Sequence, residues 1–345
     1  MENSSVNLIS NEYSNNIEEV LMEICEVCFT QISYHSKLNL NSYANLMSSS
    51  IDNLHLSDLI KNDLLNRFQR LLSEEITFSK FFHYEEHDLN SLSLINYQEI
   101  SGQQTQSFHS NLPDCLIKSA YIKTLIHYKK ELEDFQNFAK EILKKVYKLC
   151  NGELVYFDVF VVFAGIIIEK PISLENEISL LPFEQDFRAI FSHRATPASS
   201  GYGEAPIGMI YLTQEPLKIY EITKTIPKED KSLFENFSSQ FEQLINQIPL
   251  AVTLASKSNN AESISYKADY RLKPIGLTGH GSNDNNFGVH LNRTATKEEV
   301  GNIKNFIKIF QNTNNQKISI AESKLISSLT SRSSNIDRLI DAIKV

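Results

Sequence analysis

The sequence predicts an α+β protein with a helical amino-terminal region, a central mixed module of helices and antiparallel strands, and a helical carboxy-terminal segment. Apolar residues recur every three or four positions through much of residues 1–150, which is the spacing of one helix face. A Val-, Phe- and Ile-rich run at 154–168 then indicates a buried strand, and residues 264–272 alternate strictly between apolar and polar, as a half-buried strand does. We therefore divide the chain into residues 1–150, 151–295 and 296–345, in keeping with the two or three domains that this length suggests.

Three apolar stripes predict the helices of the first region. They comprise Ile17, Val20, Leu21, Ile24 and Cys28; Ile60, Leu64, Phe68, Leu71 and Leu72; and Leu125, Tyr128, Leu132, Phe135, Ala139, Ile142, Val146 and Leu149. The third stripe alternates steps of three and four without a break, so it predicts one long helix with a narrow seam. Asn151 and Gly152 supply its stop signal. The polar stretch at 90–110 is predicted to be a loop.

The central module is predicted from the alternation of strand, helix and turn signals. In order, these are the strand run at 154–168, a short helix at 183–193, a loop at 195–204, strands near 207–212 and 217–223, a helix opened by Pro227, the strand at 264–272 and a hairpin punctuated by glycines from Gly276 to Gly288. From residue 296 onward the pattern is helical. One stripe there contains Val300, Ile303, Ile307 and Phe310, and another spans 318–329.

The net charge and the amino-terminal residues limit the possible binding partners and the cellular compartment of the protein. A net charge of −9 and an isoelectric point near 5.6 argue against attraction of the whole chain to nucleic acid or to an anionic membrane. The first residues carry no secretory signal, and the longest apolar stretch is shorter than the ~20 residues of a membrane-spanning helix. With four cysteines and no such signal, the sequence predicts a cytoplasmic protein with free thiols and no contact with a membrane.

Two short motifs use metal-ligating residue types. Residues His83 to His87 read H-Y-E-E-H, the spacing that places two imidazoles on one helix face in inverted zinc peptidases. We interpret them as the solvated end of a helix, because no further ligand segment follows, and keep a metal site that uses His83 and His87 as an alternative. Cys25 and Cys28 have C-x-x-C spacing inside an apolar helical stripe, so we interpret them as core residues. We expect neither a metal nor another cofactor.

Arg188 and His193 form an R-x4-H string. In HEPN ribonucleases, which are small helical RNA-cleaving domains, R-x4–6-H is the catalytic signature: the arginine holds the phosphate and the histidine moves the proton. In this chain Ala189 follows the arginine, where that family usually has a polar residue. We therefore predict no catalytic residue in this chain, and keep a nuclease that uses Arg188 and His193 as an alternative.

The last residues carry a resemblance to a known family. Ile318-Ser-Ile-Ala-Glu322, Leu329-Thr-Ser-Arg332 and Asp337-Arg-Leu-Ile-Asp-Ala-Ile343 resemble the junction in ApeA-like abortive-infection proteins, where an α+β region runs into a HEPN domain. The resemblance covers residues 150–345, and its specific part is confined to the last thirty. It implies that residues 296–345 lead into a truncated HEPN-like helical domain, and that the setting is bacterial defence against phage by endoribonuclease cleavage of RNA. It carries no catalytic residue onto this chain, because the HEPN helices that hold the R-x4–6-H pair are not matched here.

The final apolar stripe bears on the partners. Ile336, Leu339, Ile340 and Ile343 lie on one predicted helix face, and no stop signal follows them. We expect either that other residues of the chain cover this face or that its natural continuation is missing. A homodimer through the carboxy-terminal helices would also cover it.

These observations give one leading functional hypothesis and two alternatives. The leading hypothesis is the non-catalytic sensing or scaffold portion of a HEPN-type abortive-infection ribonuclease, whose partners are RNA or a phage-derived trigger. The first alternative is a stand-alone binding module that recognises a phage product or a nucleic acid. The second is a hydrolase that uses Arg188 and His193.

Overall fold

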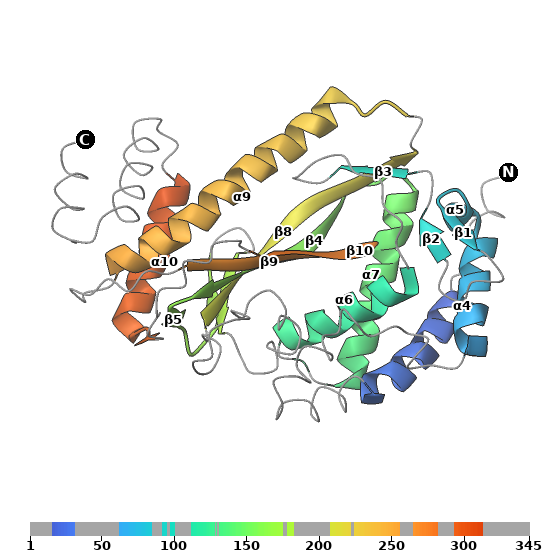
Figure 1. Ribbon diagram of the computed structural model, residues 1–345, viewed down its shortest axis with the longest axis horizontal. Helices are drawn as coiled ribbons and strands as arrows, with labels where there is room; N and C mark the ends of the chain where they lie inside the picture. Colours follow the sequence, from blue (N-terminus) through green and yellow to red (C-terminus); the bar gives the residue numbers. More distant parts are fainter. Residues whose placement is uncertain are drawn as a thin grey trace, which may run out of the picture.

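An antiparallel sheet with helices on both faces forms the centre of the molecule, which confirms the predicted combination of helices and antiparallel strands (Figure 1). The computed structural model describes residues 16–31, 62–84, 92–94, 97–100, 112–127, 129, 131–174, 178–182, 208–221, 224–255, 265–281 and 293–312. The predicted elements at 183–193, 195–204 and 318–329, and the final stripe from Ile336 to Ile343, lie outside these residues.

The sheet has seven strands and is antiparallel throughout. In spatial order the strands are β10 (Gly276–Gly281), β9 (Ser265–Lys273), β4 (Val155–Ala164), β8 (Gly208–Glu221), β7 (Ser179–Pro182) and β6 (Ile172–Ser173), with β3 (Tyr97–Ile100) also paired to β8. The apolar run predicted as a buried strand is β4, which lies between β8 and β9. Strands β9 and β10 form a hairpin that turns at Pro274 and Ile275. The turn predicted at the glycines from Gly276 onward is wrong at Gly276, Gly279 and Gly281, which lie within β10.

Strand β8 is longer than the sequence predicts. Its 14 residues pair with β4 over Gly208 to Leu217 without interruption, so the two predicted strands near 207–212 and 217–223 are one. The other edge of β8 is divided between two partners: β7 pairs with Met209 to Leu212, and β3 pairs with Lys218 to Glu221. The predicted loop at 90–110 is therefore wrong in part, because it contains β3 and the short strand β2 (Leu92–Leu94).

Both faces of β4 are buried. Alternate residues of a strand point to opposite faces, and the residues from Phe157 to Phe163 are buried without exception. Phe157, Val159 and Val161 share one face with their opposed residues on β8 and β9, while Asp158 and Phe160 share the other. Helix α9 (Lys228–Ala255) contacts the first face, and α6 (Leu112–Ile126) and α7 (Leu132–Cys150) contact the second.

Helices α6 and α7 replace the one long helix predicted over 125–149. The chain turns after α6, where the Lys129 N–H donates to the Thr124 carbonyl at 2.8 Å, and α7 then packs back on α6 with Tyr121 edge-on to Phe135. The apolar spacing continues across the turn because both helices bury a stripe, which is why the pattern alone did not reveal the break. The predicted stop is confirmed: Gly152 has a φ of 79°, and its N–H donates to Leu149.

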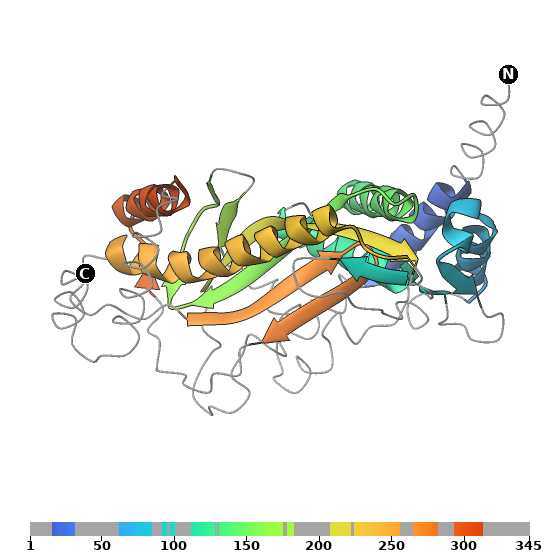
Figure 2. The same cartoon turned by 90° about the horizontal axis from the view of Figure 1, so that it is seen from above.

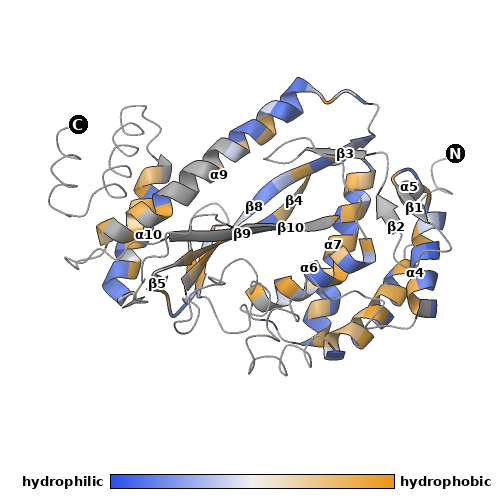
Figure 3. Ribbon diagram, viewed as in Figure 1, coloured by the Kyte–Doolittle hydropathy of each residue, from blue (hydrophilic) through white to orange (hydrophobic). Residues whose placement is uncertain are grey.

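The amino-terminal helices pack on the outer side of α7. They are the helix at 16–31, α4 (Asn62–Glu74) and α5 (Ile76–Ser79), and a two-stranded hairpin of β1 (Phe82–Tyr84) and β2 follows them. Phe29 stacks on Phe135, and Phe78 contacts the ring of Tyr147 at 4.2 Å between centroids. The orange, hydrophobic sides of α4 and α7 are visible in Figure 3. Their buried side chains join the sheet in one continuous core, and the domain boundaries at 150 and 295 stay predictions.

Helix α10 (Lys297–Asn312) packs against α9 at the end of the sheet away from α7, as two views show (Figures 1 and 2). It begins with a capping box: the Thr296 N–H donates to the Glu299 carboxylate at 2.8 Å, and the Glu299 N–H donates to the Thr296 hydroxyl at 3.2 Å. The residues just before it form β11 (Arg293–Thr294), which pairs in parallel with β5 (Ile166–Ile167). Helices α9 and α10 confirm the helices that the sequence predicts after Pro227 and after residue 296. Among the described residues, no helix has the length and apolar character required to cross a membrane.

The burial of β4 on both faces can be tested by substitution. Phe160 is fully buried, whereas Tyr156 on the same strand is 47% exposed. We expect Phe160→Ala to lower the free energy of unfolding by about 3–5 kcal/mol, because it leaves a cavity in the core. Tyr156→Ala, which removes an aromatic ring of similar size, should cost about 1 kcal/mol or less. Urea denaturation measures both, and equal losses would contradict this account of the sheet.

Candidate functional site

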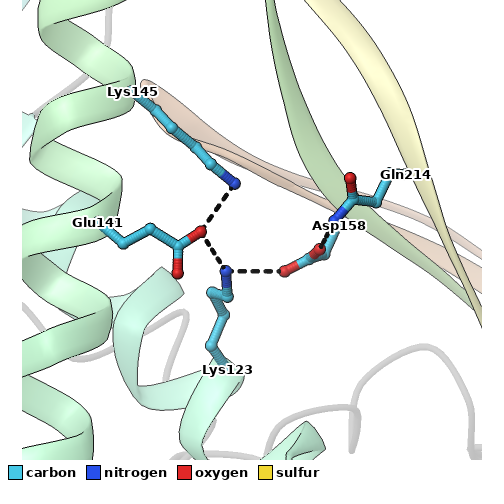
Figure 4. A network of polar contacts seen from close by, with 5 residues as sticks. All are labelled: Lys123, Glu141, Lys145, Asp158 and Gln214. Carbon is cyan, nitrogen blue, oxygen red and sulfur yellow. Dashed lines mark hydrogen bonds and ion pairs between the residues drawn. The ribbon is translucent and has the colours of Figure 1, made fainter. Parts of the chain in front are cut away.

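The ammonium group of Lys123 is a buried charge at the junction of α6, α7 and β4. Helix α6 directs this side chain toward the sheet, where it is only 7% exposed. Its Nζ lies 3.2 Å from the Asp158 carboxylate on β4 and 3.0 Å from Glu141 Oε1 on α7 (Figure 4). A buried charge is tolerated only when it is paired and hydrogen-bonded. The lysine therefore joins three elements of the fold at one point.

A second lysine completes a balanced group of four charges. Lys145 Nζ lies 3.0 Å from the same Glu141 oxygen, four residues further along α7, an arrangement that favours a helical ion pair. We call Lys123, Glu141, Lys145 and Asp158 the tetrad; its two cations and two anions cancel. Gln214, the direct partner of Asp158 on β8, donates from Nε2 to the aspartate at 3.3 Å. The tetrad is therefore neutral, with hydrogen bonds from the sheet as well as the helices.

The local charges set the proton affinities of the tetrad. Burial disfavours the Lys123 ammonium, but Asp158 and Glu141 together hold the pKa of Lys123 above its ordinary value. Burial opposes ionisation of Glu141 as well, and the two lysines hold the pKa of that carboxyl below its ordinary value. Both groups thus stay charged at neutral pH. A protonated lysine is not a nucleophile; in this state the tetrad links α6, α7 and β4 through ion pairs.

His127 lies next to the tetrad, at the end of α6. Its ring stacks on Phe138 with 5.4 Å between centroids, and Lys123 lies 5.2 Å from the centre of the same Phe138 ring. Desolvation lowers the pKa of His127; the Lys123 cation lowers it as well, and the Asp158 and Glu141 carboxylates partly oppose the shift. The imidazole is therefore neutral at pH 7.

A second buried network lies on the opposite face of the sheet. Arg271 on β9 donates from Nε to Glu215 and from Nη1 to Asp269, each at 2.8 Å. Its guanidinium carbon lies 5.6 Å from the ring centre of Phe241 on α9. Because the arginine is 3% exposed and Glu215 is fully buried, the network is closed to substrates and holds α9 to the sheet.

The residues predicted as candidate sites do not meet in the described structure. Arg188, His193 and His87 lie outside the described residues. His83 lies in strand β1, so the predicted helix end at 83–87 is wrong at this position. A strand does not provide the one-turn spacing that the H-x-x-E-H motif requires. In the part of the chain that the structure describes, no group of three or more His, Cys, Asp and Glu side chains could hold a metal ion.

The cysteines confirm their predicted role as core residues. Cys25 and Cys28 are fully buried in the helix at 16–31. Burial raises the pKa of the Cys28 thiol to about 12 and that of Cys25 further still. Thiols at such pKa values carry almost no reactive thiolate at neutral pH.

The contribution of the buried Lys123–Asp158 pair can be measured against that of an exposed pair, Lys129–Asp134. Asp158 and Asp134 each pair with a lysine at close to 3 Å, but the Lys123–Asp158 side chains are 7% and 6% exposed, and the Lys129–Asp134 side chains are 54% and 26% exposed. Asp158→Ala should lower the free energy of unfolding by about 3–5 kcal/mol, because it leaves a buried ammonium short of a partner. Asp134→Ala should cost about 1 kcal/mol or less. Urea denaturation of the two variants checks this, and a small loss in Asp158→Ala would show that water reaches Lys123.

The pH dependence of stability tests Glu141. Its pKa is lowered in the folded protein, so its contribution is present above the ordinary value of 4.5 and is lost as the pH falls through the folded value. The melting temperature of the wild type should therefore fall more steeply below about pH 4.5 than that of Glu141→Gln. Glu133→Gln, an exposed position on the same helix, is the control and should follow the wild type. Parallel curves for Glu141→Gln and the wild type would contradict the assignment.

The comparisons with known proteins give no relative from which a function could be transferred. No family model, no curated protein and no solved structure matches this chain.

Proposed function

We propose that this chain is the non-catalytic sensing or scaffold portion of a HEPN-type abortive-infection ribonuclease that acts in the bacterial cytoplasm against phage. One observation carries the proposal: the order of apolar, basic and acidic residues from Ile318 to Ile343, which resembles the entry into a HEPN domain in ApeA-like proteins. On this proposal, residues 296–345 lead into that helical domain, and RNA or a phage-derived trigger is the partner.

The arrangement of the preceding elements supports the proposal. The resemblance implies strands, a long helix, a hairpin and then helices, and the structure has β8, α9, the β9–β10 hairpin and α10 in this order. The buried charges support a scaffold role as well. In both networks the charged groups pair with one another across secondary-structure elements. This pairing stabilises the fold and leaves, within these two networks, no free acid and base of the kind that RNA cleavage requires.

An activity assay tests the non-catalytic part of the proposal. The purified chain should cleave RNA no faster than buffer, and Arg188→Ala and His193→Ala should behave as the wild type does. A labelled RNA separated on a denaturing gel provides the measurement. Cleavage that is lost in either variant would replace the proposal with the alternative nuclease, because a phosphate-binding arginine and a proton-transferring histidine are both required for that mechanism.

A phage assay tests the biological setting separately. Bacteria that carry the gene in its natural reading frame should plate a panel of phages less efficiently than bacteria from which the gene is deleted. Unchanged plating of every phage, with the protein detected in the cells, would favour the stand-alone binding module over the defence protein.

A further inference from the structure

We infer that the exposed side of α7 binds the phosphodiester backbone of a nucleic acid. In the unbound protein, the Glu141 carboxylate occupies the place that one phosphate of the bound strand takes.

The two lysines of the tetrad converge on a single oxygen atom. Lys123 Nζ and Lys145 Nζ both lie 3.0 Å from Glu141 Oε1, as Figure 4 shows. Two ammonium groups at hydrogen-bond distance from one oxygen define a position for an oxyanion. The Glu141 side chain is 44% exposed, whereas Lys123 and Asp158 are almost entirely buried. The glutamate can therefore rotate into solvent, while the lysine remains paired with Asp158.

The charge count favours an oxyanion with one negative charge. The tetrad is neutral with Glu141 in place, because its two lysines balance two carboxylates. A phosphodiester carries one negative charge, so exchanging it for the glutamate leaves the buried group neutral. A phosphate monoester carries about two charges near neutral pH and would leave the site net negative. The geometry thus suits a phosphate within a nucleic-acid strand better than a terminal one.

Further lysines continue from this position along the exposed side of α7. Lys144 and Lys148 are exposed and lie one helical turn apart, with about 5–6 Å between Cβ atoms. The opposite side of the helix buries Phe135, Ala139, Ile142, Leu143, Val146 and Leu149, so the polar stretches of α7 in Figure 3 turn outward. Cations are also stabilised near the carboxyl end of a helix. A row of flexible ammonium groups beside the oxyanion position fits successive phosphates of one strand.

Fluorescence anisotropy with a labelled single-stranded oligouridylate tests the surface. The wild-type chain should bind with an affinity that falls as salt rises. Lys144→Met with Lys148→Met should weaken binding and lower the slope of log K against log salt by about 1.4, because each lysine that neutralises one phosphate of a single strand contributes ~0.7 to that slope. Lys304→Met, an exposed lysine on α10, is the matched control and should bind as the wild type does. Equal slopes for the double variant and the wild type would overturn the assignment of α7.

A second pair of variants tests the role of Glu141. Glu141→Gln should bind the oligouridylate roughly three- to tenfold more tightly, because the internal competitor loses its charge. Glu133→Gln removes one charge from the exposed side of the same helix and should change affinity little. If both substitutions tighten binding equally, long-range charge is the cause and the displacement of Glu141 is refuted. Polyglutamate that competes as well as the nucleic acid would show an acidic protein surface to be the partner instead. Thermal unfolding confirms that each variant is folded.

Discussion

The central strand β4 has to be covered on both of its faces, and this constraint determines where the helices lie. It pairs with β8 along its whole length and with β9 from Val159 to Ala164, and its side chains are buried from Phe157 to Phe163. Elements before β4 in the sequence, α6 and α7, cover one face, and α9, which follows β8, covers the other. Each covered face includes a charged group. Lys123 pairs with Asp158 on one side, and Arg271 pairs with Glu215 and Asp269 on the other.

Elements with one strong local pattern could be predicted from the sequence. The run around β4, the alternation of β9, the helix after Pro227 and the stripe of α10 were predicted and are present. The sequence predictions were wrong where pairing with a distant strand determines the secondary structure. β8 reads as two strands because polar Thr213, Gln214 and Glu215 interrupt its apolar residues, yet β4 pairs with all three. β3 lies in a polar stretch and is a strand only because the end of β8 leaves an edge for it.

The polar networks were harder to predict than the fold. Asp158 gave a signal, since it is an acidic residue in the middle of an apolar run, and such a residue needs a buried cation. Nothing in the sequence identifies Lys123 as that cation, because α6 also contains Lys118 and both lie among apolar residues. Glu141 and Lys145 look like an ordinary surface pair on a helix. Only the packing of α6 and α7 on the sheet brings the four charges together.

The divided edge of β8 has a consequence for synthesis on the ribosome. Residues Tyr97 to Ile100 pair with Lys218 to Glu221, so more than a hundred residues must be made before β3 has its partner. α6 and α7 can form earlier from local contacts, but the face that they bury on the sheet stays open until β4 and β8 have emerged. Such long-range pairing slows folding and leaves apolar surface exposed on the nascent chain. Chaperone binding during translation should therefore fall in stages, first as β4 and β8 pair, then as α9 emerges, and last as β9 and β10 complete the sheet.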